Sequence, residues 1–197
     1  MTAPSSPQLI LASTSPYRRA LLQRLGVEFE AIAPAVDEEA LKDPALGAKA
    51  MAEALAAAKA RSLQDRFPAA TIIGSDQVCA CEGQILNKPG DFAGACAQLM
   101  QLAGKAHQLL TAVCVVHQGH EHRFTDVTTL QMRTLTPHEI ERYLRADQPY
   151  DCVGSYKLEE RGIALFDAID SADHTAITGL PLIALAKVLR DCGHAAP

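Results

Sequence analysis

The chain has 197 residues, of which 48% are hydrophobic, so a single core can bury most of the surface that the unfolded chain exposes. The formal net charge of −5 argues against a protein that binds nucleic acid through many phosphate contacts. The N-terminus has no basic segment followed by an apolar one, and no run approaches the roughly 18 apolar residues of a membrane span. We therefore expect a soluble, cytoplasmic protein with one domain over residues 1–197.

The first half of the chain alternates short apolar runs with helical patterns. Ser15 followed by Pro16 is typical of a helix start, and Gly26 is typical of a helix end. In chain order, the patterns predict a strand over 9–13, a helix from Ser15 to about Gly26, a half-buried strand over 27–33, an alanine-rich helix over about 47–66, and a strand that ends at residues 74–77.

The second half contains hairpins as well as helices. Thr136 and Glu139 form a capping box with proline in the first turn. The predicted elements are a hairpin around Glu82-Gly83, a helix from Asp91 to Gly104, two strands around residues 117–122, a helix from Thr136, and a last helix from about Pro181 to Gly193. Because hairpins pair strands in antiparallel fashion, we expect an α/β domain with a mixed sheet rather than a purely parallel one.

Cysteine and histidine clusters are weak candidates for metal sites. The six cysteines are scattered in a chain that is too long to need disulfides, so free buried thiols are expected. Cys79 and Cys81 have no second cysteine pair to complete a structural zinc site. The three histidines of the segment HQGHEH (117–122) surround Gly119, which favours a polar hairpin tip.

Several polar residues fall where predicted elements begin or end. Ser13 closes the first strand, and Arg18 lies in the first turn of the next helix, where free N–H groups favour an anion. Glu38 follows the second strand, Lys59 lies on the alanine-rich helix and Lys88 lies in a turn. Each residue taken alone fits a helix cap, a turn or a solvated charge equally well, so none is specific by itself.

Asp76 and its neighbours interrupt an apolar strand. The segment IIGSDQV (72–78) places a carboxylate and an amide where the strand is predicted to end. A carboxylate in that position can activate water or bind a cation. A turn residue at the end of a strand is the structural alternative.

The order of these motifs resembles the Maf family of nucleoside triphosphate pyrophosphatases. The resemblance covers about residues 9–190 and rests on S-x-S-P-x-R from Ser13, D-E at 37–38, K-A at 59–60, G-S-D-Q-V at 74–78 and N-K-P at 87–89. It implies an elongated, two-lobed α/β fold of the Maf/ITPase type, in which helices flank a mixed sheet around a central cleft. It also implies a hydrolase that splits a nucleoside triphosphate into the monophosphate and pyrophosphate, with Mg²⁺ or Mn²⁺ as cofactor.

The resemblance assigns roles that suit this chemistry. Asp76 is expected to be the proton acceptor that activates water, and Glu38 and Asp76 are expected to bind the metal. The residues expected to bind phosphate are Ser13, Arg18, Lys59 and Lys88.

Three further positions concern the base. Residues 150–163 and 179–185 look like the branch of the family that acts on 7-methyl-GTP. The branch that acts on dTTP and UTP would carry arginine, threonine and glutamine where this chain has Tyr17, Gln77 and Glu159. A base methylated at N7 carries a positive charge, which an aromatic face and a carboxylate both favour. These three residues are therefore the expected determinants of substrate specificity.

The loop near Glu159 departs from that branch, in which we expect glycine at the position of Glu160 and small residues at those of Val153 and Leu158. Two alternatives stay open: a dTTP/UTP pyrophosphatase of the same family, and a non-catalytic nucleotide-binding regulator of septum formation. The expected partner is a nucleoside triphosphate, without nucleic acid or membrane. A homodimer also stays open.

Overall fold

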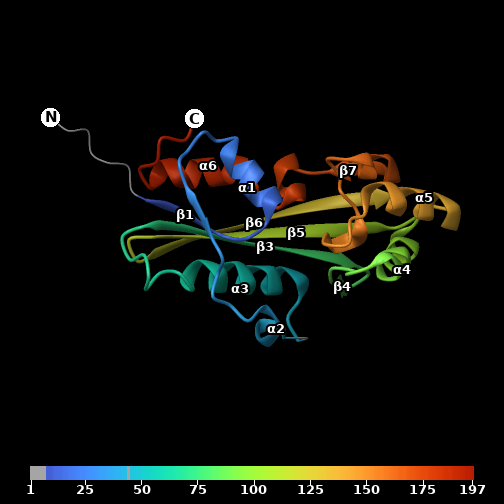
Figure 1. The fold of residues 1–197 in the computed structure, drawn as a ribbon, viewed down its shortest axis with the longest axis horizontal. Helices are drawn as coiled ribbons and strands as arrows, with labels where there is room; N and C mark the ends of the chain where they lie inside the picture. The colour runs from blue at the N-terminus through green and yellow to red at the C-terminus, as the bar shows by residue number, and fades with distance from the viewer. Residues whose placement is uncertain (1–7, 44) are drawn as a thin grey trace.

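A seven-stranded mixed sheet runs along the length of the molecule in the computed structural model, which describes residues 8–43 and 45–197 (Figure 1). The strand order is β2-β1-β3-β5-β6-β7, with β4 paired to β3. β1 is parallel to β2 and β3, and the other pairs are antiparallel, which confirms the mixed sheet. The strands are β1 (Leu9–Ala12), β2 (Glu30–Ile32), β3 (Thr71–Cys81), β4 (Gln84–Leu86), β5 (Ala106–His117), β6 (His120–Met132) and β7 (Phe166–Asp170).

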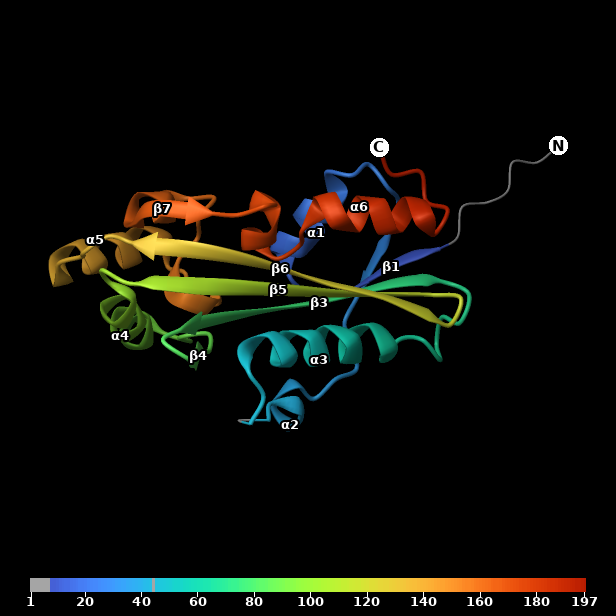
Figure 2. The same ribbon diagram turned by 180° about the vertical axis from the view of Figure 1, so that it is seen from behind.

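Helices cover the sheet differently at its two ends (Figures 1 and 2). At one end α3 covers one face, while α1 and α6 cover the opposite face; α4 and α5 gather at the other end. The helices are α1 (Pro16–Gln23), α2 (Glu38–Leu41), α3 (Ala48–Arg61), α4 (Phe92–Leu102), α5 (Pro137–Asp147) and α6 (Leu182–Asp191), with 3₁₀ turns η1 (Val153–Ser155), η2 (Arg161–Leu165) and η3 (His174–Thr178).

Helix caps and hairpin turns follow the sequence signals. Ser15 Oγ accepts from the backbone N–H of Arg18, and Asp91 caps α4 in the same way. Both halves of the capping box between Thr136 and Glu139 form at the start of α5. These contacts satisfy N–H groups that have no partner inside their helices, which is why the starts of these helices could be predicted.

Three buried clusters divide the core into two lobes. One cluster packs α3 against the sheet and includes Ile10 and Ile72; another packs α1 and α6 against the opposite face and includes Leu22 and Ile73. A third cluster, which includes Leu99, lies under α4 and α5. β3 and β5 contribute to all three clusters, so these long strands join the two lobes.

Gly74 brings the backbones of β3 and α3 into direct contact. A Cβ atom at this position would lie 2.2 Å from the carbonyl oxygen of Ala56 and 2.6 Å from the backbone nitrogen of Ala60. Only glycine fits such an approach, and the alanines of α3 allow it from the other side. The helix therefore lies as near to the strand as its backbone permits.

Some predicted bounds were wrong. β3 does not end at residues 74–77 but continues to Cys81, so Asp76 lies in the middle of a strand. Its apolar pattern breaks because polar residues there line a cleft, not because the strand ends. The predicted strand over 27–33 shrinks to Glu30–Ile32, of which two residues are exposed, and the alanine-rich helix ends at Arg61.

The remaining expectations were partly met. Cys96 and Cys152 are only partly buried, while the other four thiols are buried as predicted. His117 and His120 flank the turn of the β5–β6 hairpin. Over residues 8–43 and 45–197, no group of three or more His, Cys, Asp and Glu side chains is arranged to hold a metal ion. Within the same ranges, no helix is long and apolar enough to cross a membrane.

Candidate active site

A cleft of about 690 Å³ lies between the two lobes. Its walls come from the β1–α1 turn, α2, α3, the middle of β3, the segment after β4, the loop 151–159 and the end of η3. The whole set of candidate residues from the sequence lines this one cleft: Ser13, Tyr17, Arg18, Glu38, Lys59, Asp76, Gln77, Lys88 and Glu159.

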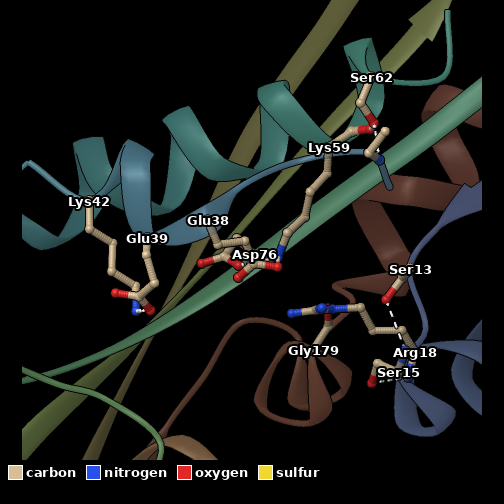
Figure 3. Close-up of polar contacts among 11 residues, drawn as sticks. Ser13, Ser15, Arg18, Glu38, Glu39, Lys42, Lys59, Ser62, Asp76 and Gly179 are labelled. Carbon is tan, nitrogen blue, oxygen red and sulfur yellow. Dashed lines mark hydrogen bonds and ion pairs between the residues drawn. The ribbon is translucent and has the colours of Figure 1, made fainter. Parts of the chain in front are cut away.

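Lys59 joins two carboxylates at the centre of the cleft. Its Nζ atom lies 2.7 Å from Asp76 Oδ1 and 3.0 Å from Glu38 Oε1 (Figure 3). Lys59 and Asp76 are 5% and 8% exposed, whereas the Glu38 side chain is about half exposed. Because α3 lies so near to β3 at Gly74, the lysine reaches the aspartate two residues further along the same face of the strand.

The pKa of Glu38 reflects the charges around its carboxyl group. Partial burial alone would raise the pKa of its carboxyl, but the hydrogen bond and charge of Lys59, with the charges of Lys88 and Arg18, lower that pKa on balance. Lys88 is exposed on the rim of the cleft. Three cations therefore surround one carboxylate in a space that also holds Asp76.

Arg18 approaches the same carboxylates from the side opposite α3 (Figure 3). Burial lowers the pKa of its guanidinium, while Asp76 and Glu38 act in the opposite direction. Its Nε donates to the carbonyl of Gly179 at 3.1 Å. At the start of α1, Ser13 Oγ accepts from the backbone N–H of Ser15 at 3.1 Å. The helix N-terminus, Ser13 and Arg18 together offer donors to an anion.

Tyr17 and Glu159 face the cleft from different lobes. Tyr17 follows the first residue of α1, and Glu159 lies in the loop after η1. The Nζ of Lys157 lies 5.9 Å from the centre of the Tyr17 ring. Partial burial and the neighbouring Cys152 raise the pKa of Tyr17, against the opposite effect of Lys157. Sequence reasoning missed Lys157, whose only signal was its place two residues before Glu159.

Buried hydrogen bonds fix the backbone of this loop. Tyr156 Oη lies 2.9 Å from His107 Nε2, and Ser155 Oγ donates to Gln98 Oε1 at 2.7 Å. The backbone N–H of Lys157 donates to Tyr143 Oη at 2.9 Å. The loop therefore presents its side chains from a rigid support.

The departures from the family pattern fall on both sides of the loop. Val153 and Leu158 line the cleft, where their size bears on the space for a ligand. Glu160 is exposed and does not line it. The first two departures thus concern the cleft itself, and the third concerns the loop's outer surface.

Gln77 uses its amide nitrogen inside the protein. Nε2 lies 2.9 Å from Thr111 Oγ1, 2.9 Å from the carbonyl of Ala176 and 3.0 Å from that of Ile177. Gln77 thereby ties η3 to the sheet. Sequence reasoning missed η3 and its contacts, because a 3₁₀ turn that packs on a distant strand leaves no periodic pattern.

The cleft offers two carboxylates, those of Glu38 and Asp76, that could bind a metal ion. Glu38 and Asp76 converge on one nitrogen atom, and carboxylate oxygens are the ligands that Mg²⁺ and Mn²⁺ prefer. Because no larger cluster exists among the described residues, the remaining ligands would have to come from substrate and water. The donor set thus fits a cation that binds together with a phosphate.

The fold has a solved counterpart. A HAM1 protein from Coxiella burnetii superposes with a TM-score of 0.52 over 94% of this chain and 99% of that one, at 13% sequence identity. This likeness establishes the class of fold, an elongated α/β sheet with a central cleft. The family follows from sequence: the model described as Maf-like protein matches residues 8–192, and the chain belongs to the Maf family.

Similar relatives cover nearly the whole chain. A protein of Bdellovibrio bacteriovorus named 7-methyl-GTP pyrophosphatase is 50% identical over 184 residues, which are 93% of this chain and 96% of that protein. A protein of Xanthomonas oryzae with the same name is 51% identical over 191 residues, or 97% of this chain and 100% of that protein.

Proposed function

We propose that this chain is a hydrolase that cleaves 7-methyl-GTP into 7-methyl-GMP and pyrophosphate, and so removes a modified nucleotide. The observation that carries the proposal is the identity of about one half, over nearly full length, to relatives that bear this name. The cleft adds support, because the paired charges around Asp76 share it with Tyr17 and Glu159. The reaction breaks an acid anhydride bond between the α and β phosphates.

The triphosphate is assigned to the positively charged part of the cleft. Arg18 and Ser13 offer donors at the start of α1, and Lys88 offers an exposed cation that lines the cleft. Lys59 is buried in the cleft between the carboxylates, so its charge also favours the phosphates. These groups balance the charge that develops on the departing pyrophosphate.

Asp76 is assigned as the proton acceptor. A water oxygen forms a bond to the α phosphorus, the bond from that phosphorus to the bridging oxygen breaks, and pyrophosphate leaves with the electron pair. The Asp76 carboxylate takes the proton of the water. Its position in the middle of β3 fixes the Cα atom that carries the carboxylate, because Asp76 pairs with Ala112 of β5.

Glu38 and Asp76 are the residues that would hold the divalent cation, Mg²⁺ or Mn²⁺. When bound, the cation would neutralise phosphate oxygens. Lys59 donates to both carboxylates and keeps them oriented toward the same point.

The base is assigned to Tyr17 and Glu159. The aromatic ring favours a cationic base, and the carboxylate can accept from the N1–H and exocyclic amine of guanine. Lys157 already lies over part of the Tyr17 ring, so it leaves less of the ring face for a base. The rigid backbone of the loop keeps Glu159 in place without immobilising its side chain.

The test is pyrophosphate release by the purified chain from 7-methyl-GTP, GTP, UTP and dTTP, each with Mg²⁺ and with Mn²⁺. The expected result is the highest kcat/KM for 7-methyl-GTP and at most background release by the matched variant Asp76→Asn. A preference for UTP or dTTP would move the chain to the pyrimidine branch. Binding of nucleotides without any release would favour the non-catalytic regulator.

A further inference from the structure

The middle of β3 serves two faces of the sheet. Side chains alternate along a strand, so Asp76 points to the α3 face while Ser75 and Gln77 point to the opposite face. Asp76 meets Lys59 on its face. Ser75 and Gln77 meet the segment 176–179, which contains the end of η3 and the residue that caps it.

Gln77 binds this segment with every donor it has. A glutamine amide carries two N–H hydrogens, and three acceptors lie within 3.0 Å of Nε2: Thr111 Oγ1 and the carbonyls of Ala176 and Ile177. Thr111, the residue of β5 that pairs with Gln77 of β3, also donates to the carbonyl of Ala176 at 2.9 Å. Backbone carbonyls only accept, so the nitrogen of the amide must face them, and none of its hydrogens is left for a base.

Ser75 binds the end of the same segment. It is fully buried, and its Oγ donates to the carbonyl of Gly179 at 3.0 Å. That carbonyl also accepts from Arg18 Nε at 3.1 Å. One oxygen atom therefore joins the strand that carries Asp76 to the guanidinium that approaches Asp76 from the other side.

Gly179 packs closely against Arg18 in a backbone conformation that favours glycine. Its φ of +116° is a conformation that side chains rarely adopt, and a Cβ there would lie 3.2 Å from Arg18 Nε and 3.3 Å from Arg18 Cγ. The aliphatic part of Arg18 thus packs directly on Gly179 while its Nε bonds to the carbonyl. Moving segment 176–179 moves the guanidinium.

We propose that Gln77 and Ser75 are positioning residues: they hold segment 176–179 so that the Gly179 carbonyl orients Arg18 toward the triphosphate. Gln77 then acts on every substrate through Arg18, with its amide nitrogen held by segment 176–179 and Thr111. The proposal rests on the proposed function only in taking Arg18 as a phosphate contact. It adds a second role to the one that the resemblance gave to Gln77, which was specificity for the base.

The first experiment uses pyrophosphate, which has no base. Its affinity for the full chain, with Mg²⁺, is measured by calorimetry in wild type, Gln77→Met, Ser75→Ala and the control Gln108→Met, which changes an exposed glutamine of β5. We expect Gln77→Met and Ser75→Ala to weaken pyrophosphate binding by roughly 10-fold, which is the order of one charge-assisted hydrogen bond, and Gln108→Met to bind as wild type does. Unchanged affinity in both variants would overturn the proposal, as would a wild type that binds no pyrophosphate.

The second experiment is a double-mutant cycle on kcat/KM for 7-methyl-GTP and UTP. If Gln77 acts through Arg18, Gln77→Met costs the same factor for both substrates and almost nothing further in the Arg18→Ala background. Independent factors that multiply, or a change confined to 7-methyl-GTP, would overturn the proposal. Ser75→Ala, which removes one hydroxyl, repeats the cycle if Gln77→Met does not fold. A wild type without turnover on any triphosphate would refute the proposed function, and the pyrophosphate titration would still decide the role of Gln77.

Discussion

The α3 side of the cleft and the loop 151–160 are built by different means. On the α3 side the functional groups hold one another: Lys59 pairs with Asp76 and Glu38 inside the cleft. In the loop the supporting hydrogen bonds lie inside the protein, between Tyr156 and His107 and between Ser155 and Gln98. Glu159, at the front of the loop, has no hydrogen bond or ion pair with any described residue.

This difference separates two kinds of change. A substitution on the α3 side removes a functional group and its partner's support at once, so it affects every substrate. A substitution at the front of the loop leaves the supporting bonds intact, so it changes the ranking of substrates and little else. The loop would lose its support through a change in the buried residues that hold its backbone, such as His107 and Gln98. Three predictions test this division, and a fourth concerns Tyr17 of α1, whose ring lies beside Lys157 of the loop.

The largest effect is expected at Asp76. Asp76→Asn keeps the shape of the side chain but removes the basic oxygen, so kcat should fall by roughly 10²-fold or more for every triphosphate, while substrate still binds. Steady-state kinetics on 7-methyl-GTP and UTP measure both quantities. Near-normal turnover would show that another group accepts the proton.

The support behind the loop is expected to weaken in acid through His107. Burial lowers the pKa of this imidazole to about 4 from its ordinary 6.5, and its Nδ1 has no partner among the described residues. Below pH 6.5 the unfolded chain therefore binds a proton that the folded chain does not bind. The resulting stability is present above pH 6.5 and is lost as the pH falls to about 4, on the order of 2–3 kcal/mol in all.

Urea unfolding of wild type and His107→Gln between pH 7 and pH 4 measures this loss. The free energy of unfolding should fall less steeply with acid in the variant, while His138→Gln, an exposed change on α5, is the matched control. Parallel curves for wild type and His107→Gln would mean that the imidazole is not buried in its neutral form.

The front of the loop is tested by Glu159→Gln. If the carboxylate binds a cationic guanine, neutralising it should cost about 1–3 kcal/mol of transition-state stabilisation on 7-methyl-GTP and less on UTP. The ratio of kcat/KM for the two substrates should therefore fall, and the melting temperature should stay the same. An equal loss on both substrates would place Glu159 with the phosphate groups.

The smallest effect is expected at Tyr17. Tyr17→Ala removes an aromatic face in an open cleft, which should cost about 0.5–2 kcal/mol on 7-methyl-GTP and less on UTP. Tyr17→Phe keeps the ring and should retain the wild-type ratio of kcat/KM. If both variants lose the same amount, the hydroxyl and not the ring matters for the substrate.

Local signals allowed most helices and the hairpins to be predicted. Caps such as Ser15 and Thr136 act on neighbouring residues, so their effect can be read from the sequence. β3 could not be predicted in full, because Asp76 is a polar residue in mid-strand whose partner, Lys59, lies on another element. β7 could not be predicted, because this edge strand is mostly exposed and lacks a strong apolar pattern, whereas β2 is only a short part of the strand predicted over 27–33.

The candidate site divides in the same way. The motifs selected nine residues, and the structure brings all nine to one cleft, although their roles stay predictions. What the sequence could not indicate is the contact between Gly179 and Arg18, which lie 161 residues apart in the chain. Such a contact depends on how η3 packs against β3 and β5, which no local pattern encodes.

Gly74 sets the separation between β3 and α3 at one wall of the cleft. Since β3 and α3 approach through backbone atoms, the thickness of the helix–sheet interface sets how far the Lys59 side chain must reach to meet Asp76. Even an alanine at position 74 would act as a wedge and carry the ammonium away from the carboxylate. Over evolutionary time, divergence in substrate is therefore expected to accumulate at Tyr17 and in the loop 151–160, while the spacing at Gly74 stays closed to change.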